Sequence, residues 1–301
     1  MSTRYRSSLL LVFFLLLIAV ARVRAQKDDL SPEALRQIEH ADPQWAIIQP
    51  HLPDPLTATA EKLEMAGDVL RARRFPNEAL DYYSYAVRRG GKEVQLLNKM
   101  GITELELRHN RRARAYFQRV VQLKKKSAEG WNNLGAVEYL ERRFGNAISD
   151  YNRAIKLNKK GASYHSNLAT AYFEQKDYES ARKEYDIALK LDPDMFERTG
   201  SGGGVTAHML SPVDHARYCF EMARLFAQRG DEDSMMRFLT KASEGGFNIL
   251  EAMGPDSVLN RYRKDPRVLL VARNADAMRN NRFNIASVPG GAPQLPPPLH
   301  E

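Results

Sequence analysis

Small and apolar residues recur along the chain at a fixed interval of 34 positions between residues 60 and 194. Four columns keep their character through four successive units. These columns are Gly67, Gly101, Gly135 and Ala169; Ala79, Ala113, Ala147 and Ala181; Tyr83, Phe117, Tyr151 and Tyr185; and Ala86, Val120, Ala154 and Ala188. Agreement of that depth indicates an internal repeat, so we expect one structural unit to be used four times.

Inside each unit the apolar positions have helical spacing on two successive stretches. In the third unit Trp131 and Leu134 lie on the first predicted helix, and Ala147, Tyr151 and Ala154 lie on the second. Small residues stand where two helices approach closely, and the aromatic residue fills the space beside them. One such pair cannot bury its own apolar face, so stacked pairs are expected to form a curved solenoid.

The motif of the third unit resembles the tetratricopeptide repeat (TPR) family. It reads Trp131-Asn132-Asn133-Leu134-Gly135, and the fourth unit ends in Leu191-Asp192-Pro193, as repeats of that family often do. The resemblance extends from Ala60 to about Asp194. It implies an all-α protein, a right-handed α-solenoid of TPR helix-turn-helix repeats with a TPR-like helical cap at its C-terminal end. The implied repeats are residues 60–93, 94–127, 128–161 and 162–195.

The first 25 residues predict a secretory signal peptide. Arg4 and Arg6 precede an apolar run of 13 residues, Leu9 to Ala21, whereas a membrane-spanning helix needs about 20. Small residues then stand where signal peptidase reads, so cleavage is expected after Ala25; the alternative is an uncleaved membrane anchor. No later segment is expected to cross a membrane. We therefore expect an exported protein, periplasmic or secreted, and its resemblance to exported TPR proteins suggests a Gram-negative bacterium.

Further helices are expected on both sides of the repeats. Within the Pro-rich segment 26–59, Ser31-Pro32-Glu33-Ala34 is typical of a capped helix start, and a short helix to about His40 is predicted. After the Gly-rich linker 196–210, Ser211-Pro212-Val213-Asp214 is a second start signal, of the capping-box type.

The C-terminal part predicts a degenerate repeat and a cap. Ala223, Phe226, Leu239 and Ala242 fall at the spacings of the TPR columns, although Met235 replaces the expected alanine. Capping helices are expected to follow, because a terminal repeat needs a polar outer face. The predicted ranges are 211–282 for this region, Pro255–Arg263 and Pro266–Asn280 for the two capping helices, and 283–301 for a disordered Pro-rich tail.

The charge and the motifs exclude several classes of function. The formal net charge of +8 falls to about +4 without the four arginines of residues 1–25, which is weak evidence for nucleic-acid binding. No catalytic or phosphate-binding motif occurs, so no enzyme activity, cofactor or metal is expected. His165 stands where the family usually has Trp and is expected in the core or at its rim. Cys219, the single cysteine, lies on an apolar helical stripe and is expected to be buried.

Resemblance to TPR proteins also implies a concave groove lined mainly by the first helix of each repeat. Matching positions are acidic in the first unit, amides in the second and third, and hydroxyls in the fourth, and one further column is largely apolar. The candidate partner-binding residues are Glu64, Asp68, Asn98, Asn132, Ser166, Thr170, Leu105, Tyr139 and Phe173.

The groove columns favour an extended peptide over an acidic C-terminal tail. Side-chain amides can pair with an extended backbone, and Tyr139 with Phe173 would provide an apolar shelf. The lysines of the clamp with which some TPR domains bind chaperone tails are missing from these columns. Glu104 and Glu138 occupy the usual core aromatic position, so Leu105 and Tyr139 belong either to the core or to the groove, and the sequence leaves both open.

The turns between helices are basic at repeating positions, including Arg108, Arg142 and Arg143. Solvated turns explain this pattern, and a basic edge that attracts an anionic surface is the sharper alternative. Two functions remain. The first is a non-catalytic scaffold of the cell envelope that binds a protein or peptide in the groove. The second is an accessory subunit that docks on anionic envelope polymers or headgroups through the basic turns.

Overall fold

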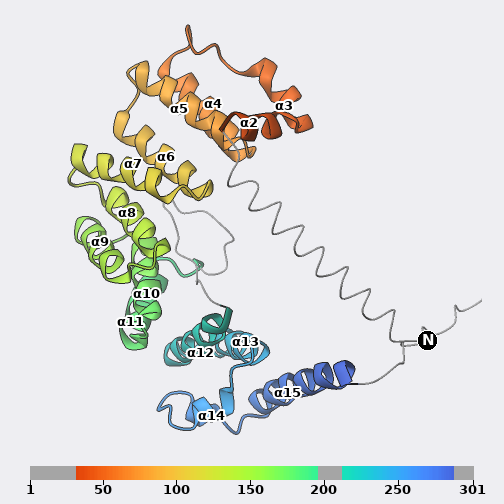
Figure 1. Cartoon of the computed structure of the whole chain (residues 1–301). Helices are drawn as coiled ribbons and strands as arrows, with labels where there is room; N and C mark the ends of the chain where they lie inside the picture. Colours follow the sequence, from red (N-terminus) through yellow and green to blue (C-terminus); the bar gives the residue numbers. More distant parts are fainter. Residues whose placement is uncertain (1–31, 196–211, 288–301) are drawn as a thin grey trace, which may run out of the picture. The chain divides into compact units, whose positions relative to one another are not determined.

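The computed structural model describes residues 32–195 and 212–287, and every element in these two stretches is a helix (Figure 1). The predicted signal peptide, the whole of the Gly-rich linker and the tail beyond Ser287 lie outside the described residues. None of the described helices combines the length and the apolar character needed to span a bilayer.

The helices follow one another in pairs joined by short turns. Their bounds are α2 Pro32–His40, α3 Pro43–Ile48, η1 Gln49–His51, α4 Ala60–Ala72, α5 Pro76–Arg88, α6 Glu93–Glu106, α7 Asn110–Leu123, α8 Ala128–Leu140, α9 Phe144–Leu157, α10 Ala162–Glu174, α11 Tyr178–Leu191, α12 Pro212–Arg229, α13 Glu232–Glu244, α14 Ile249–Met253, η2 Asn260–Tyr262 and α15 Pro266–Ser287.

Local sequence sets many of the helix starts. The Thr59 side chain caps α4 by accepting a hydrogen bond from the Lys62 N–H, and Asp177 caps α11 in the same way through Ser180. Pro76 begins α5, where its missing N–H costs nothing. The short helix α3, which the sequence analysis did not predict, starts with the same signals, an Asp42 cap followed by Pro43.

The turn between the two helices of a pair has the same backbone in all four repeats. One residue in each turn has a positive φ, and these residues are Arg74 (67°), Arg108 (63°), Arg142 (59°) and Lys176 (65°). The amide of the residue after it closes the helix end; for example, Arg143 N–H donates to the Glu138 carbonyl at 2.9 Å. The side chain at this position is exposed to solvent in all four repeats, which is where a cation is tolerated.

Close approach of the paired helices depends on the small column of the first helix. A Cβ atom added at Gly67 or Gly101 would lie 2.5 Å from the ring of Tyr83 or Phe117. At Gly135 it would lie 2.8 Å from the Tyr151 ring. The aromatic rings themselves are fully buried. The sequence predicted this combination of a small residue and an aromatic filler, and the structure confirms it.

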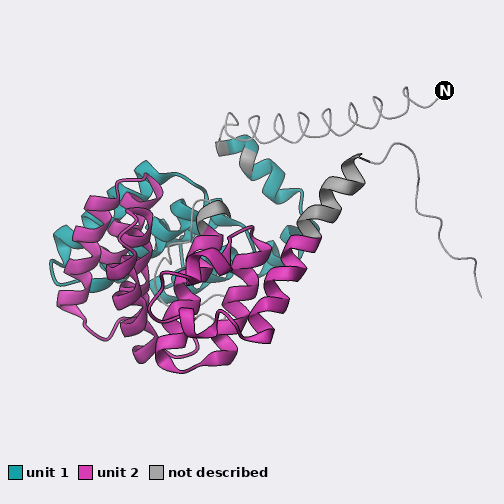
Figure 2. Cartoon of the chain, turned by 90° about the horizontal axis from the view of Figure 1, so that it is seen from below, with its two compact units in different colours: residues 1–130 teal, residues 131–301 magenta. Residues whose placement is uncertain are grey.

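The chain divides into two compact units, residues 1–130 and 131–301, coloured separately in Figure 2. In the first unit α4 packs on α5, α5 on α6 and α6 on α7, around a core that includes Leu63 and Tyr83. In the second unit α9, α10, α11, α12 and α13 pack in succession, and α14 and α15 pack on α13. Stacked helix pairs of this kind form an α-solenoid, so the expected all-α fold class is confirmed.

The C-terminal cap differs from the prediction in one segment. The helix expected at about Pro255–Arg263 is wrong, because this stretch consists of turns and the 3-10 segment η2. The Asp256 carboxylate accepts hydrogen bonds from the backbone N–H groups of Val258 and Leu259, which favours a turn over a helix. The helix expected to end near Asn280 continues to Ser287, since no proline or glycine interrupts it before Pro289.

Candidate interaction surface

In the first unit, the first helices of two successive repeats, α4 and α6, share a cluster of charged side chains. Lys99 of α6 donates from Nζ to Glu64 Oε1 at 2.7 Å and to Asp68 Oδ2 at 2.6 Å. Asp68 also accepts from the Tyr83 hydroxyl at 2.8 Å, and Glu64 from Gln95 at 2.7 Å. The structure therefore brings together the two predicted acidic groove residues and holds them with one lysine.

Lys99 changes the electrostatics predicted for this part of the groove. Burial acts to lower the pKa of its ammonium group, but hydrogen bonds to Asp68 and Glu64 outweigh burial and raise the pKa. Burial and the bond to Asp68 likewise raise the pKa of the Tyr83 hydroxyl. The raised pKa keeps the Lys99 ammonium group charged at neutral pH. Sequence reasoning missed Lys99 because this residue follows Asn98 and lies outside the columns that were assigned to the groove. Only the fold shows that the Lys99 side chain points toward the preceding helix α4.

The predicted residue Asn98 is nearly buried at the C-terminal side of the same unit. Its Nδ2 donates to Glu129 Oε1 at 2.6 Å. Burial raises the pKa of the Glu129 carboxyl, and the Asn98 hydrogen bond opposes that rise. Asn98 thus links α6 to the first turn of α8 within residues 1–130.

In the second unit, asparagines of α8 and α10 form a buried amide cluster. Asn167 donates to Asn132 Oδ1 at 2.9 Å, and Asn132 donates to Asn133 Oδ1 at 3.1 Å. All three side chains are fully buried. Burying carboxamides is costly unless they are hydrogen-bonded, and these amides meet that condition partly through one another. The structure joins predicted Asn132 to Asn167, which the sequence analysis did not single out.

The hydroxyl column of the fourth repeat is also buried. Thr170 Oγ1 lies 2.9 Å from the Tyr185 hydroxyl and donates to the Ser166 carbonyl, also at 2.9 Å. Ser166 and Thr170 are each 4% exposed. The hydroxyls therefore continue the polar interior of the second unit on α10.

The structure decides between core and groove for two of the three residues in the apolar column. Tyr139 and Phe173 are 0% and 3% exposed and belong to the core, so neither side chain forms an open shelf. Tyr139 packs against Phe144 with ring centroids 5.5 Å apart, and its hydroxyl donates to Glu174 Oε1 at 3.0 Å. Leu105 is half-buried.

Tyr139 is buried because of the residue that precedes it on α8. Glu138 is buried, and its carboxylate accepts from Arg143 Nε at 2.5 Å. Glu104 of the second repeat is buried in the same way, 2.8 Å from His109 Nδ1. Because these carboxylates bind the start of the following helix, they cannot fill the apolar space of the usual aromatic residue. Tyr139 fills it instead.

The three arginines of the predicted basic edge have local roles in the turns. Arg108 and Arg142 are the positive-φ residues that end α6 and α8. The Arg142 guanidinium lies 5.7 Å from the centre of the Phe144 ring, and Arg143 pairs with Glu138 and Glu141. A binding role for this edge stays a prediction.

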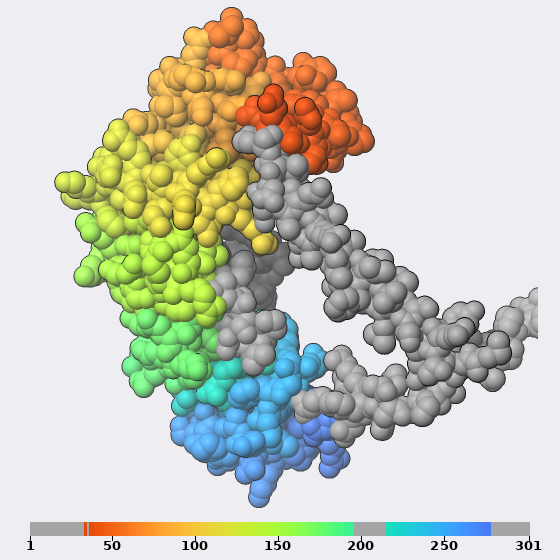
Figure 3. Space-filling model, viewed as in Figure 1, coloured from red at the N-terminus to blue at the C-terminus, as the bar shows by residue number. Residues whose placement is uncertain are grey.

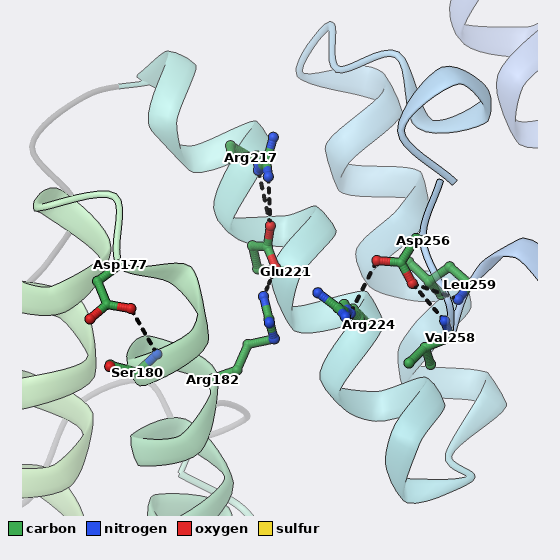
Figure 4. Close-up of polar contacts among 9 residues, drawn as sticks. All are labelled: Asp177, Ser180, Arg182, Arg217, Glu221, Arg224, Asp256, Val258 and Leu259. Carbon is green, nitrogen blue, oxygen red and sulfur yellow. Dashed lines mark hydrogen bonds and ion pairs between the residues drawn. The ribbon is translucent and has the colours of Figure 1, made fainter. Parts of the chain in front are cut away.

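A cavity of about 910 Å³ lies between α11 and α12 of the second unit, and its lining is mostly charged. Glu221 of α12 is 5% exposed and accepts hydrogen bonds from Arg182 at 2.5 Å and from Arg217 at 3.0 Å (Figure 4). Arg224 pairs with Asp256 at 3.1 Å. The cavity's other cations also have carboxylate partners: Lys183 with Glu179, and Lys190 and Arg229 with Asp186. These pairs neutralise the cavity, which is therefore a poor anion site.

Two residues that the sequence placed in or near the core are found there. His165 is 6% exposed, and its Nδ1 lies 2.6 Å from Glu184 Oε2. Cys219 is fully buried, and burial raises the pKa of its thiol to about 11, which keeps the thiol protonated. Within the part of the chain that the structure describes, no three His, Cys, Asp or Glu side chains gather as metal ligands would.

Comparisons with known proteins agree with this architecture. The tetratricopeptide repeat family model matches residues 98–162 and 141–196. No curated protein matches the chain.

Solved structures with a similar fold include three repeat proteins. MamA from Desulfovibrio magneticus RS-1 is 19% identical over 65% of this chain and 97% of its own, with a TM-score of 0.44. PilF of Pseudomonas aeruginosa is 18% identical over 73% and 82%, with a TM-score of 0.46. YrrB, a TPR protein with an unusual peptide-binding site, is 15% identical over 68% and 91%, with a TM-score of 0.41. Since these TM-scores lie below 0.5, the likenesses carry no argument about a ligand.

Proposed function

Because this chain is a TPR-containing protein, we propose that it is a non-catalytic scaffold of the cell envelope that holds an extended segment of a partner protein against the first helices of its repeats. Each repeat contributes one such helix, so the scaffold offers polar side chains at a regular interval, although their chemistry differs between repeats. An extended segment has a regular row of backbone donors and acceptors that suits this arrangement.

The amide cluster of α8 and α10 is the observation that supports the proposal most. Asn132 and Asn167 are fully buried and hydrogen-bonded side chain to side chain at 2.9 Å. Apolar residues in these positions would pack without the free-energy cost of desolvating a carboxamide, so packing alone does not explain the asparagines. A carboxamide both donates and accepts hydrogen bonds, so it can pair with a peptide backbone of any sequence. Binding of this kind requires Asn132 and Asn167 to exchange their mutual hydrogen bond for bonds to the partner's backbone.

The charged cluster of α4 and α6 gives the first unit a different contact. Asp68 keeps 45% of its side chain exposed even though it pairs with Lys99. Glu64 and Lys99 are less exposed, at 18% and 22%. Both Asp68 oxygens already accept hydrogen bonds from Lys99, so a basic side chain of a partner segment would share this carboxylate with Lys99 from its exposed side. This contact would give the first unit a preference for a segment that carries a basic side chain.

Peptide selection tests this function directly. A random extended-peptide library is panned on the purified protein, and the affinities of the selected peptides are measured by fluorescence polarisation. Asn132→Ala with Asn167→Ala should weaken these peptides about ten-fold or more, which is the loss of roughly 1.4 kcal/mol of binding free energy. Thermal melting followed by circular dichroism checks that the variants are folded.

The matched control removes an amide from the second helix of a repeat, which does not line the proposed groove. Asn152 of α9 is half-buried, and its Nδ2 donates to the Ile148 carbonyl of the same helix. Asn152→Ala should leave the affinity of the selected peptides within two-fold of the starting protein. The proposal fails if the library yields no binder, or if binding survives in the Asn132 and Asn167 variant.

A further inference from the structure

One helix of the first unit differs from the other second helices of the repeats in its charge. The sequence of α7 contains four arginines and no acidic residue. The corresponding helices α5, α9, α11 and α13 each mix acidic and basic residues. The stretch after α7 adds Lys124, Lys125 and Lys126, all exposed. The repeat pattern does not require this charge, because the other repeats form the same helix without it.

Three of the four arginines of α7, namely Arg111, Arg112 and Arg119, point away from the core of the unit. Phe117 and Val120 pack inward and are at most 1% exposed. Arg112 and Arg119 keep 62% and 54% of their side chains exposed, and Arg111 is exposed as well. Arg111 and Arg119 are eight residues apart, about 12 Å along the helix axis. The yellow region of Figure 3 is the surface of this helix pair, α6 and α7.

The acidic partners of Arg112 and Arg119 are distant. Arg119 lies 3.7 Å from Glu93, and Arg112 lies 3.9 Å from Glu104, both near the limit of an ion pair. Glu104 is buried and already lies 2.8 Å from His109. On α11, by contrast, Lys183 lies 2.7 Å from Glu179. The face of α7 therefore keeps a net positive charge, whereas the charges on α11 cancel.

We propose that Arg111, Arg112 and Arg119, together with Lys124–Lys126, form a docking surface for the phosphate groups of an anionic lipid bilayer. These six residues are called the α7 basic face. The face extends over about 20 Å, from Arg111 to Lys124 at 1.5 Å per residue, so it meets several headgroups at once. The planar guanidinium of arginine matches the oxygens of a phosphate in pairs.

A bilayer fits this face better than a peptide does. The arginines project from the outward side of a helix, and a flat surface reaches them all without entering a groove. The only large apolar side chain exposed on the helix is Leu123, which is 40% exposed, so the face does not have the apolar stripe of a helix that inserts into lipid. Binding should therefore be peripheral and sensitive to salt. It is independent of the peptide contacts proposed above.

Vesicle flotation tests the proposal. The protein is prepared without residues 1–25, whose apolar run would bind any vesicle, and the described helices begin only at Pro32. It should float with vesicles of 30% phosphatidylglycerol in phosphatidylcholine at 50 mM salt. It should float neither with pure phosphatidylcholine nor at 500 mM salt. Replacing Arg111, Arg112 and Arg119 by glutamine should weaken binding about 100-fold, since each basic residue contributes about five-fold.

The matched control removes three charges elsewhere. Lys156→Gln, Lys183→Gln and Lys190→Gln replace exposed lysines of α9 and α11, and this variant should keep its affinity within a few-fold. An equal loss in the two variants would overturn the proposal, because net charge alone would then explain binding. Absence of flotation by the starting protein would overturn it as well. So would tighter binding of soluble poly-glutamate through the same arginines, which would identify an acidic protein as the partner.

Discussion

Contacts between single residues set the distance between the two helices of a pair. In the second repeat the Gly101 position faces the Phe117 ring so closely that an added Cβ would lie 2.5 Å away. In the fourth repeat alanine stands at this position, and Ala169 is fully buried. The first three repeats thus depend on the missing side chain, whereas the fourth accommodates a methyl group at this position.

Two glycine-to-alanine substitutions should therefore have opposite effects. Gly101→Ala should lower the free energy of unfolding by about 1–3 kcal/mol, because the Phe117 ring must shift inside a packed core. Gly145→Ala in α9 adds a Cβ that meets nothing within 4 Å, so it should raise stability by roughly 0.5–1 kcal/mol through helix propensity. Urea unfolding measures both effects. Destabilisation by both substitutions would contradict the packing described for Gly101.

Asp150 should make stability depend on pH. Burial raises the pKa of its carboxyl to about 6, the charge of Glu138 adds to the rise and Arg153 opposes it. The folded state then holds this proton more tightly than the unfolded state, so stability falls as the pH rises from about 4 through 6. Asp150→Asn should increase stability at pH 7.5 by about 1 kcal/mol, a figure reduced for solvent screening of a half-exposed group.

The same substitution should change little at pH 4, where the protonated aspartate of the starting protein resembles asparagine. Urea unfolding of the two proteins at pH 4.0 and pH 7.5 gives the comparison. An equal difference at both pH values would show that Asp150 does not titrate as described.

At the scale of helices, a buried ion cluster ties α11 to α12. Glu221 is 5% exposed and lies between Arg182 of α11 and Arg217 of its own helix (Figure 4). Arg217 also covers the Tyr178 ring at 4.6 Å. Removal of one partner from a buried ion pair is costly, because the remaining charge is left without compensation.

Glu221→Ala should therefore destabilise the second unit by about 2–4 kcal/mol, since it leaves two arginines facing each other. Lys183→Ala is the control on the same face of α11, where the pair with Glu179 is about 70% exposed. That change should leave the stability nearly unchanged, because an ion pair in solvent contributes little. Chemical unfolding of both variants decides the matter, and a cost below 1 kcal/mol for Glu221→Ala would speak against the cluster as a tie between helices.

At the scale of the whole molecule, each helix pair is expected to be stabilised mainly by the pairs next to it. In a solenoid each helix pair contacts only the adjacent pairs, so a local defect weakens its own surroundings most. At the start of the described chain, α3 supplies Trp45, which is 8% exposed and stacks on His40 with ring centroids 4.0 Å apart. The Trp45 ring also lies 5.4 Å from that of Phe75.

Trp45→Ala should remove about 3 kcal/mol from the local stability of α4 and α5. Hydrogen exchange followed by mass spectrometry should show faster exchange in these two helices and nearly unchanged exchange in α12 and α13. A uniform loss of protection along the chain would mean that the protein unfolds as one cooperative block, contrary to this expectation. Thermal melting alone would not separate the two outcomes.

Sequence reasoning found much of the fold and less of the candidate surface. The small and aromatic columns predicted helix pairs correctly because Gly101 and Phe117 meet through spacing alone. The helix predicted around Pro255 was wrong because the Asp256 side chain accepts hydrogen bonds from the backbone N–H groups of Val258 and Leu259, which favours a turn. Lys99 was missed because its role depends on two acids some 31 to 35 residues earlier in the chain.

The sequence by itself determined the helical class and the period of the repeat, because both follow from where small and apolar residues fall along one chain. Only the tertiary structure decided that Tyr139 and Phe173 lie in the core, that Lys99 pairs with both Glu64 and Asp68, and that Asn132 meets Asn167. These outcomes depend on distances between side chains of different repeats. Periodicity predicts which face a residue occupies, but a hydrogen bond forms only when the packed helices bring its atoms within about 3 Å.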